Sequence, residues 1–397
     1  MPVLTFSVSA QQQIELSPKA QVSLITVAPG NELYSLFGHT ALRIHDPVTG
    51  INRTYNYGTF EFDASGFYWK FALGDLQYFL LASRFGYVKE AYLNAGRTII
   101  EQQLNLTPGQ VKELYRLLEI NALPKNRYYS YEFFYDNCTT RVYDIISKVI
   151  GDSFSFSGPL NPKQKSFREF INPYLEPVPW VKFGVNLLLG MPADQIPSGP
   201  ETLFLPDLLK TGFAKGIVQR ADTSVALVGQ ETIYTSPNPV SARSVFLTPA
   251  LIFWLLLGVI MILTYTYPEN TKLWIWFDRI LFGVACLVGL LILFLWLFSA
   301  YPSTKWNLNI LWSLPALPLF GVLLNTNRVL SASSKILWSI FIAIIVLFLL
   351  SWMFIPQEIP GAVFPLILLL GYRSWIRFQT KSVVSNSQPI PAKKVNM

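Results

Sequence analysis

The chain has 397 residues, of which 51% are hydrophobic and only 14% are charged, whereas soluble domains carry about 25% charged residues. Its formal net charge is +7. Residues 1–244 carry 21 basic and 21 acidic side chains, whereas residues 245–397 carry 10 basic and 3 acidic side chains. The positive excess therefore belongs to the hydrophobic half, which excludes a soluble nucleic-acid-binding protein. Two cysteines exclude a disulfide-stapled miniprotein.

Residues 1–19 are predicted to be the residual end of a signal peptide or a disordered start. Val8-Ser9-Ala10 before Gln11 has the small residues of a secretory cleavage site, although no basic residue precedes the short apolar stretch. We therefore interpret this segment as the tail of a signal peptide, with a disordered N-terminus as the alternative.

Residues 20–244 are predicted to form an α+β domain, because strand and helix patterns are mixed. The predicted strands are 22–27, 38–45, 51–57 and 98–106, and the predicted helices are 107–121 and 138–150. The turn at 46–50 makes the second and third strands a hairpin. Residues 65–95 are aromatic-rich and show no clear period. Nine prolines between residues 159 and 206 predict a Pro-rich extension, about 158–244, of loops and short helices.

Residues 245–375 are predicted to be a transmembrane domain of five helices. The apolar stretches are 245–267, 280–300, 306–324, 336–355 and 359–372. The fifth has 14 residues and, considered alone, is also compatible with a re-entrant segment. Basic residues in the loop at 325–335 and in the tail at 376–397 place these two segments in the cytoplasm and residues 20–244 outside. We expect Asp278 and Arg279 to form an interfacial ion pair.

Cys138 is the candidate nucleophile. Cys286 lies inside the second apolar stretch, so Cys138 is an unpaired thiol in an oxidising compartment, where such a thiol is a liability or a nucleophile. Asp136 or Asn137 is a good N-cap, which places Cys138 in the first helical turn, where the helix dipole is expected to lower its pKa.

His39, which follows Gly38 at the start of a strand, is the candidate base for Cys138. The only other histidine, His45, precedes a turn and is expected to be solvated. The competing interpretation is a structural histidine and an inert cysteine.

Other residues are candidates for orienting the imidazole or binding substrate. The hairpin is predicted to bring Asn56 and Tyr57 opposite residues 39–40, so that either side chain holds the imidazole or forms a cross-strand packing pair. Arg141 is predicted to bind a phosphate or carboxylate, or to pair with Asp144. The further candidates for substrate binding are Ser35 and Asn137. No metal site and no cofactor is expected.

Four sequence blocks together resemble the Lnb-type N-terminal periplasmic domain family over about residues 20–215. They are Pro29-Gly30, Ser35-x-Phe37-Gly38-His39, Tyr55-Asn56-Tyr57-Gly58-Thr59-Phe60 and Asp136-Asn137-Cys138-Thr139-Thr140-Arg141. The membrane bundle that follows is similar to that of the longer family members. The resemblance implies a permuted papain-like (NlpC/P60-type) domain, with the family's histidine and cysteine at His39 and Cys138.

The resemblance also implies a thiol acyltransferase of the cell inner membrane that acts on lipoproteins. Such an enzyme moves an acyl chain from the diacylglyceryl-cysteine to its α-amino group. Expected partners are lipoproteins or phospholipid acyl donors and membrane lipids, but not nucleic acid. The alternatives are an NlpC/P60-like cell-wall cysteine peptidase or amidase and a non-catalytic membrane scaffold. Phe67–Phe85 and Val181–Leu189 are candidate lipid-contacting segments, with ordinary core as the other interpretation.

Overall fold

The structure, a computed structural model, describes residues 15–61, 66–221, 223–239, 246–268, 271–324 and 332–379. It divides into two compact units. The first unit is Met1–Val178, Ala193–Ser244 and Ser299–Ser303, and the second is Pro179–Pro192, Val245–Phe298 and Thr304–Met397. Part of the predicted Pro-rich extension thus belongs to the second unit, contrary to our expectation of one domain over residues 20–244. Most of the predicted signal-peptide segment and of the tail lies outside the described residues.

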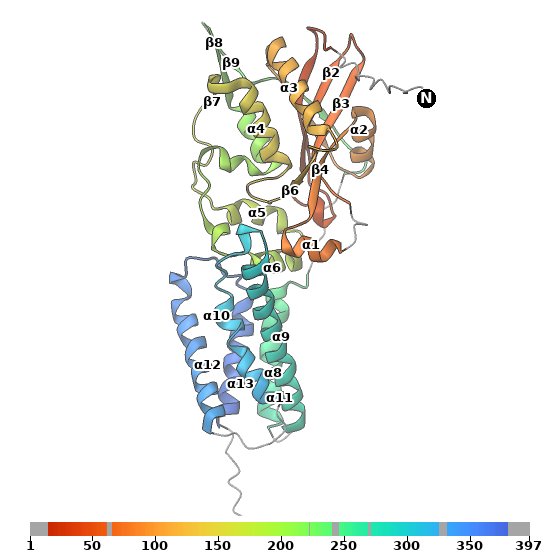
Figure 1. The fold of residues 1–397 in the computed structure, drawn as a ribbon. Helices are drawn as coiled ribbons and strands as arrows, with labels where there is room; N and C mark the ends of the chain where they lie inside the picture. The colour runs from red at the N-terminus through yellow and green to blue at the C-terminus, as the bar shows by residue number, and fades with distance from the viewer. Residues whose placement is uncertain are drawn as a thin grey trace, which may run out of the picture. The chain divides into compact units, whose positions relative to one another are not determined.

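A seven-stranded antiparallel sheet forms the centre of the first unit, in the order β10-β5-β1-β2-β3-β4-β6 (Figure 1). The strands are β1 Gln21–Val27, β2 His39–Asp46, β3 Ile51–Thr59, β4 Gln77–Arg84, β5 Ile99–Leu104, β6 Tyr128–Ser130 and β10 Val228–Tyr234. The four predicted strands are confirmed as β1, β2, β3 and β5. β4 lies where the sequence showed no clear period, and β10 comes from the predicted Pro-rich extension.

Helices cover both faces of this sheet (Figure 1). α3 and α4 lie on one face and α2 on the other. The helices of this unit are α1 Phe67–Leu73, α2 Phe85–Asn94, α3 Pro108–Ala122, α4 Cys138–Ile150, α5 Phe167–Leu175 and α7 Pro206–Ala214. A second sheet contains β7 Phe154–Phe156, β8 Gly216–Arg220 and β9 Thr223–Ala226. The predicted helices correspond to α3 and α4, so the α+β class is confirmed.

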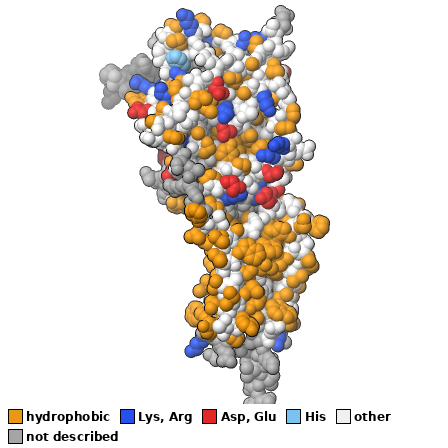
Figure 2. All heavy atoms as spheres, turned by 180° about the vertical axis from the view of Figure 1, so that it is seen from behind, with side chains coloured by type: hydrophobic (Ala, Val, Ile, Leu, Met, Phe, Trp, Pro, Cys, Tyr) orange, Lys and Arg blue, Asp and Glu red, His pale blue; other side chains and the backbone are white. Residues whose placement is uncertain are grey.

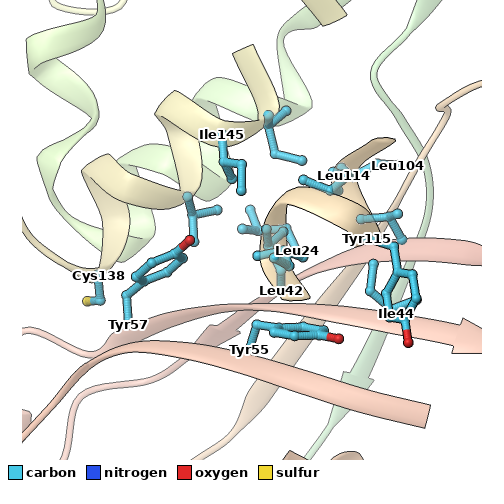
Figure 3. Close-up of a cluster of buried hydrophobic side chains, with 14 of the residues drawn as sticks. Leu24, Leu42, Ile44, Tyr55, Tyr57, Leu104, Leu114, Tyr115, Cys138 and Ile145 are labelled. Atoms are coloured by element: carbon cyan, nitrogen blue, oxygen red, sulfur yellow. The ribbon is translucent and has the colours of Figure 1, made fainter. Parts of the chain in front are cut away.

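Strands β1 and β2 are buried on both faces. Leu24 and Leu42 join the core beneath α3 and α4, and Figure 3 shows Cys138 at the edge of this core beside Tyr57. On the opposite face, Ile25 packs in a smaller cluster with Phe85 of α2. Double burial explains why β1 has apolar residues on both of its faces instead of a strict alternation.

The loop before β2 is closed by hydrogen bonds to one carbonyl group. The backbone amides of Gly30 and Gly38 both donate to the carbonyl oxygen of Ser35, at 2.9 and 3.1 Å. Gly38 has a φ of +81°, and a Cβ atom there would lie 2.7 Å from the carbonyl oxygen of Val27. Glycine at this position therefore sets how the chain enters β2 at His39.

The second unit is helical. Its helices are α6 Pro179–Leu188, α8 Pro249–Thr266, α9 Thr271–Phe298, α10 Ile310–Ser313, α11 Ala316–Leu324, α12 Ala332–Ser351 and α13 Val363–Gln379. Among the described residues, three helices are long and apolar enough to cross a membrane: Pro249–Thr266, Lys272–Phe298 and Ser333–Phe354. The third predicted stretch is divided between α10 and α11, and residues 363–372 of the fifth belong to α13. The face of this unit seen in Figure 2 is covered mostly by hydrophobic side chains.

The expected ion pair between Asp278 and Arg279 is wrong. Asp278 is fully buried and accepts hydrogen bonds from Arg373 Nε at 2.7 Å and Nη2 at 3.1 Å, and Arg377 also pairs with it. Arg279 instead donates to the carbonyl oxygen of Leu323 at 2.8 Å. Adjacent residues of a helix point in different directions, so Asp278 and Arg279 do not face each other.

The two candidate lipid-contacting segments differ in burial. In α1, Tyr68, Trp69 and Phe71 are all exposed, so this face of the helix is not core. In α6, Leu187 is buried in the core of the second unit, and its carbonyl oxygen accepts a hydrogen bond from Asn307 at 2.8 Å. The core interpretation therefore holds for Leu187 but not for α1, whereas Tyr78, Leu80 and Phe85 later in the first segment are buried in the core.

We predict that Gly38→Ala lowers the free energy of unfolding by about 2 kcal/mol or more, because it combines a strained φ with a backbone clash. Gly50→Ala is the matched control. Gly50 also has a positive φ, +76°, but a Cβ atom there meets nothing within 4 Å. Thermal unfolding of the full chain in detergent measures both variants, and equal losses would contradict the role given to the Val27 carbonyl.

Candidate active site

The first turn of α4 is held by Asn137. Its side-chain oxygen accepts hydrogen bonds from the amides of Thr139 at 2.6 Å and Thr140 at 3.0 Å. Its amide nitrogen donates to the carbonyl oxygens of Phe133 at 2.6 Å and Phe204 at 3.0 Å. These four bonds explain why the helix begins at Cys138, as predicted. They also occupy the buried Asn137 side chain, and its contact with substrate stays a prediction.

A hydrogen bond between two threonines joins the strand of His39 to the helix of Cys138. The hydroxyl groups of Thr40 and Thr139 lie 3.1 Å apart, and both residues are fully buried. Each threonine directly follows one of the two candidate catalytic residues. The backbone of Thr40 also hydrogen-bonds to Cys138 and acts to lower the pKa of its thiol. The structure therefore brings the segment of His39 against the segment of Cys138.

The imidazole of His39 is held in its neutral form. Burial lowers the pKa of His39 from 6.5 to about 4, and the positive charge of Arg97 acts in the same direction. The neighbouring Asn56 side chain partly opposes this shift. At neutral pH the imidazole is therefore unprotonated, as a general base must be before it accepts a proton.

The thiol of Cys138 is also held in its neutral form. Burial raises its pKa above the ordinary value of 9.0. The backbone of Thr40, the hydroxyl of Thr139, the amide of Cys138 itself and the charge of Arg97 all act to lower this pKa, but they do not outweigh burial. The lowered pKa expected from the helix dipole is thus wrong for this resting structure, because the desolvation of a buried thiolate is the larger effect.

His39 and Cys138 share one environment without a hydrogen bond between them among the described residues. The His39 ring lies 6.2 Å from the ring of Tyr92 in α2, and the Tyr92 hydroxyl interacts electrostatically with Cys138. Both reactive groups are neutral, so use of the sulfur as a nucleophile requires proton transfer from the thiol to the imidazole when a substrate arrives. Catalytic hydrogen bonds are often incomplete before substrate binds.

Asn56, and not Tyr57, contacts the imidazole. The predicted pairing of residues 56–57 with 39–40 is not made, because the ladder between β2 and β3 ends at Leu42 and Tyr55. Asn56 still reaches His39, although its buried Oδ1 atom makes no hydrogen bond of ordinary geometry within the described part of the chain. The Tyr57 hydroxyl accepts a hydrogen bond from Asn121 at 2.9 Å, which directs it away from that role.

Arg141 and Ser35 are engaged within the protein. The guanidinium of Arg141 donates to both carboxylate oxygens of Asp136, at 2.6 and 2.7 Å. The alternative prediction, an ion pair with Asp144, is therefore wrong. The Arg141 guanidinium also lies over the ring of Tyr129, 3.6 Å from the centroid. The buried Ser35 hydroxyl donates to the carbonyl oxygen of Glu32 at 2.8 Å. Both residues border the site, and their binding of substrate stays a prediction.

Sequence reasoning missed Arg97, Tyr92 and the two threonines. Arg97 directly precedes a predicted strand, Thr98–Leu106, and a charged residue at a strand end is ordinarily solvated. The useful signal was the Thr-Thr pair after Cys138, which belongs to the DNCTTR block. Thr40, whose hydroxyl hydrogen-bonds to that of Thr139, follows His39 in the same way.

We predict that Thr139→Val lowers the free energy of unfolding by about 1–3 kcal/mol, because it leaves the Thr40 hydroxyl buried and unpaired. The double variant Thr40→Val/Thr139→Val removes both hydroxyls and is expected to recover part of this loss. Denaturant unfolding of the full chain in detergent measures the unfolding free energies of the wild type, the single variants and the double variant, which together form a double-mutant cycle. Strictly additive losses would show that the two hydroxyls do not interact.

We predict that His39 makes the protein less stable in acid. The folded pKa, about 4, lies below the unfolded value of 6.5, so the unfolded chain binds more protons between these values. The corresponding stability is complete above pH 6.5 and is lost as the pH falls toward 4. Between pH 7 and pH 4, the wild type should lose about 2–3 kcal/mol more unfolding free energy than His39→Gln. His45→Gln is the control and is expected to lose as much unfolding free energy between pH 7 and pH 4 as the wild type. If His45→Gln loses as little as His39→Gln, the acid sensitivity does not come from His39 alone.

Comparison with protein families gives two matches, which together cover about three quarters of the chain. Residues 9–169 match the Lnb N-terminal periplasmic domain, and residues 241–382 match the Lnb transmembrane domain. Neither the curated proteins nor the solved structures give a match. The first family match contains every candidate site residue, from Ser35 to Arg141. The chain therefore belongs to the Lnb family, as a membrane protein that joins an Lnb N-terminal periplasmic domain to an Lnb transmembrane domain.

Proposed function

We propose that this protein is a cysteine-dependent acyltransferase that modifies lipoproteins. The observation that carries the proposal is the Thr40–Thr139 hydrogen bond, which joins the segment of a neutral thiol at the start of α4 to the segment of a neutral imidazole at the start of β2. The Lnb family membership supports a lipoprotein-modifying enzyme. The permuted papain-like topology implied by the family resemblance belongs to the same proposal.

The proposed reaction has two acyl-transfer steps. In the first, His39 takes the thiol proton, the sulfur attacks the ester carbonyl, and the C–O bond to glycerol breaks. The imidazolium returns the proton to the departing alkoxide. In the second step, the lipoprotein α-amine attacks the thioester, the C–S bond breaks, and the proton released by the amine returns the sulfur to a thiol through His39.

The surroundings of Cys138 suit an apolar acyl chain. Cys138 belongs to a core cluster that contains Tyr57, Tyr78 and Tyr129, with Tyr131 packed against it. The rings of Tyr78 and Tyr131 are stacked, with centroids 4.4 Å apart. An aromatic wall beside the nucleophile favours a lipid donor over a polar cell-wall peptide, which is the alternative substrate class for a papain-like domain.

The amide hydrogens at the start of α4 are suited to stabilise the oxyanion of each step. Asn137 already occupies the amides of Thr139 and Thr140, whereas the amide of Cys138 itself faces the sulfur and acts to lower the thiol pKa. Preorganised backbone donors of this kind stabilise a tetrahedral intermediate without reorganisation. The Cys138 amide is therefore the donor that we assign to the developing oxyanion.

The proposed topology is a five-span anchor in the inner membrane. It places the first unit in the periplasm and the basic C-terminal tail in the cytoplasm, following the distribution of lysine and arginine. In this arrangement the catalytic domain works on the side where acylated lipoproteins are exposed. Lipoproteins or phospholipids are the proposed acyl donors.

We predict that Cys138→Ala abolishes N-terminal acyl transfer in cells, because no thioester can form. Mass spectrometry of lipoprotein N-terminal peptides should show loss of the N-acylated species by about 100-fold or more, as for removal of an essential nucleophile. Cys286→Ala is the matched control, since this buried thiol lies in α9 and is expected to leave acylation unchanged.

Unchanged acylation in Cys138→Ala, with the protein present at its normal level, would overturn the proposal. A change in peptidoglycan fragments in place of lipoprotein N-termini would support the cell-wall peptidase instead. No change in either class of molecule would favour a non-catalytic scaffold.

A further inference from the structure

Arg97 is a buried cation with an unused hydrogen-bond donor. Its side chain is 7% exposed, and its Nε atom donates to the carbonyl oxygen of Ala28 at 2.7 Å. The Nη2 atom is buried and has no hydrogen-bond partner among the described residues. Burying a guanidinium donor without a partner costs free energy, so this donor is open to a negatively charged partner.

The fold holds Arg97 rigidly at the end of the sheet where His39 lies. Its backbone amide donates to the carbonyl oxygen of Tyr92 at 2.9 Å, at the C-terminal turn of α2. In the ladders, Val27 of β1 pairs with both His39 of β2 and Ile99 of β5. The residues at these strand ends therefore converge, and Arg97 comes from the same end as His39.

Tyr92 contacts both Arg97 and His39. The guanidinium carbon of Arg97 lies 5.0 Å from the centroid of the Tyr92 ring, and the His39 ring lies 6.2 Å from the same ring. The charge of Arg97 acts on both reactive groups, since it lowers the pKa of His39 and that of Cys138. Arg97 thus belongs to the environment of the candidate dyad, although no acidic side chain neutralises it by an ion pair in the described part of the chain.

We propose that Arg97 supplies the fixed positive charge that stabilises negative charge developing at Cys138, with its open Nη2 atom as the donor facing that charge. This inference rests on the proposed use of Cys138 as a nucleophile. The charge favours the thiolate over the thiol and disfavours the imidazolium. The resting pair therefore stays neutral, and the thiolate gains stability once the proton has moved. Arg97 is a charge-stabilising residue and not the base.

The other titratable groups around the sulfur do not carry compensating charge at neutral pH. Tyr92, Tyr129 and Tyr131 interact with Cys138, and burial raises the pKa of each of them, that of Tyr92 to about 12. Tyr34 faces Arg97. Arg141, which lies over Tyr129, is neutralised by Asp136. Arg97 is therefore the group whose charge acts on the thiol between pH 6 and 9.

Alkylation of Cys138 by iodoacetamide tests the inference without requiring acyl transfer. The full chain in detergent is used in a Cys286→Ala background, so that Cys138 is the single thiol. We expect Arg97→Gln to slow alkylation at pH 7.5 about tenfold and to move the rate profile up by about one pH unit. Arg97→Lys keeps the charge and is expected to restore most of the rate. Arg116→Gln, which removes an exposed cation paired with Glu113, is the control and should react like the parent.

A second measurement does not depend on whether Arg97→Gln folds. In the parent protein, the rate ratio of anionic iodoacetate to neutral iodoacetamide at Cys138 should exceed the ratio for free cysteine, because an open cation attracts the anionic reagent. A ratio equal to or below that of free cysteine would overturn the inference. So would an unshifted pH profile in folded Arg97→Gln.

The outcomes also separate this inference from the proposed function. If Cys138→Ala abolishes lipoprotein acylation while Arg97→Gln alkylates like the parent, only the role of Arg97 fails. If acylation survives in Cys138→Ala, the acyltransferase proposal fails, and the alkylation data still report whether Arg97 controls the thiol.

Discussion

The buried hydrogen bond between Thr40 and Thr139 is the constraint on which the candidate site depends. It joins β2 to α4 one residue after His39 and one residue after Cys138, so it fixes the position of the two reactive segments relative to each other. The other local features serve this contact. Asn137 sets the first residue of α4, and Gly38 sets the first residue of β2. A buried pair of hydroxyls is directional, so it specifies register more closely than the apolar packing around it.

Burial, more than any single charge, decides the chemistry of the site. It lowers the pKa of His39 and raises that of Cys138, so both groups are neutral before substrate arrives. A preformed thiolate–imidazolium pair would require more solvation than this site provides. The charge of Arg97 then matters because little water screens it. Before substrate binds, the site therefore contains a neutral imidazole, His39, a neutral thiol, Cys138, and a nearby cation, Arg97.

The second unit uses buried polar groups to specify how its helices pack. Asp278 of α9 pairs with Arg373 and Arg377 of α13, and Arg373 also donates to the hydroxyl of Thr264 in α8 at 3.0 Å. A buried carboxylate costs free energy unless it is paired and hydrogen-bonded, so these contacts favour one arrangement of the three helices over others. The hydrophobic surfaces of the helices alone would not select it.

The sequence by itself determined the features that have local causes. A β-branched run predicted β1, and apolar residues at alternate positions predicted β2 and β5. The Asp-Asn-Cys-Thr-Thr segment predicted where α4 begins, because an N-cap acts within one helical turn. Charge and apolar length predicted a hydrophobic membrane unit. Only the tertiary structure decided that Asn56 rather than Tyr57 contacts His39, that burial outweighs the helix dipole at Cys138, and that Arg97 belongs to the site. Each of these depends on which segments distant in sequence exclude water together, and periodicity and spacing contain no such information.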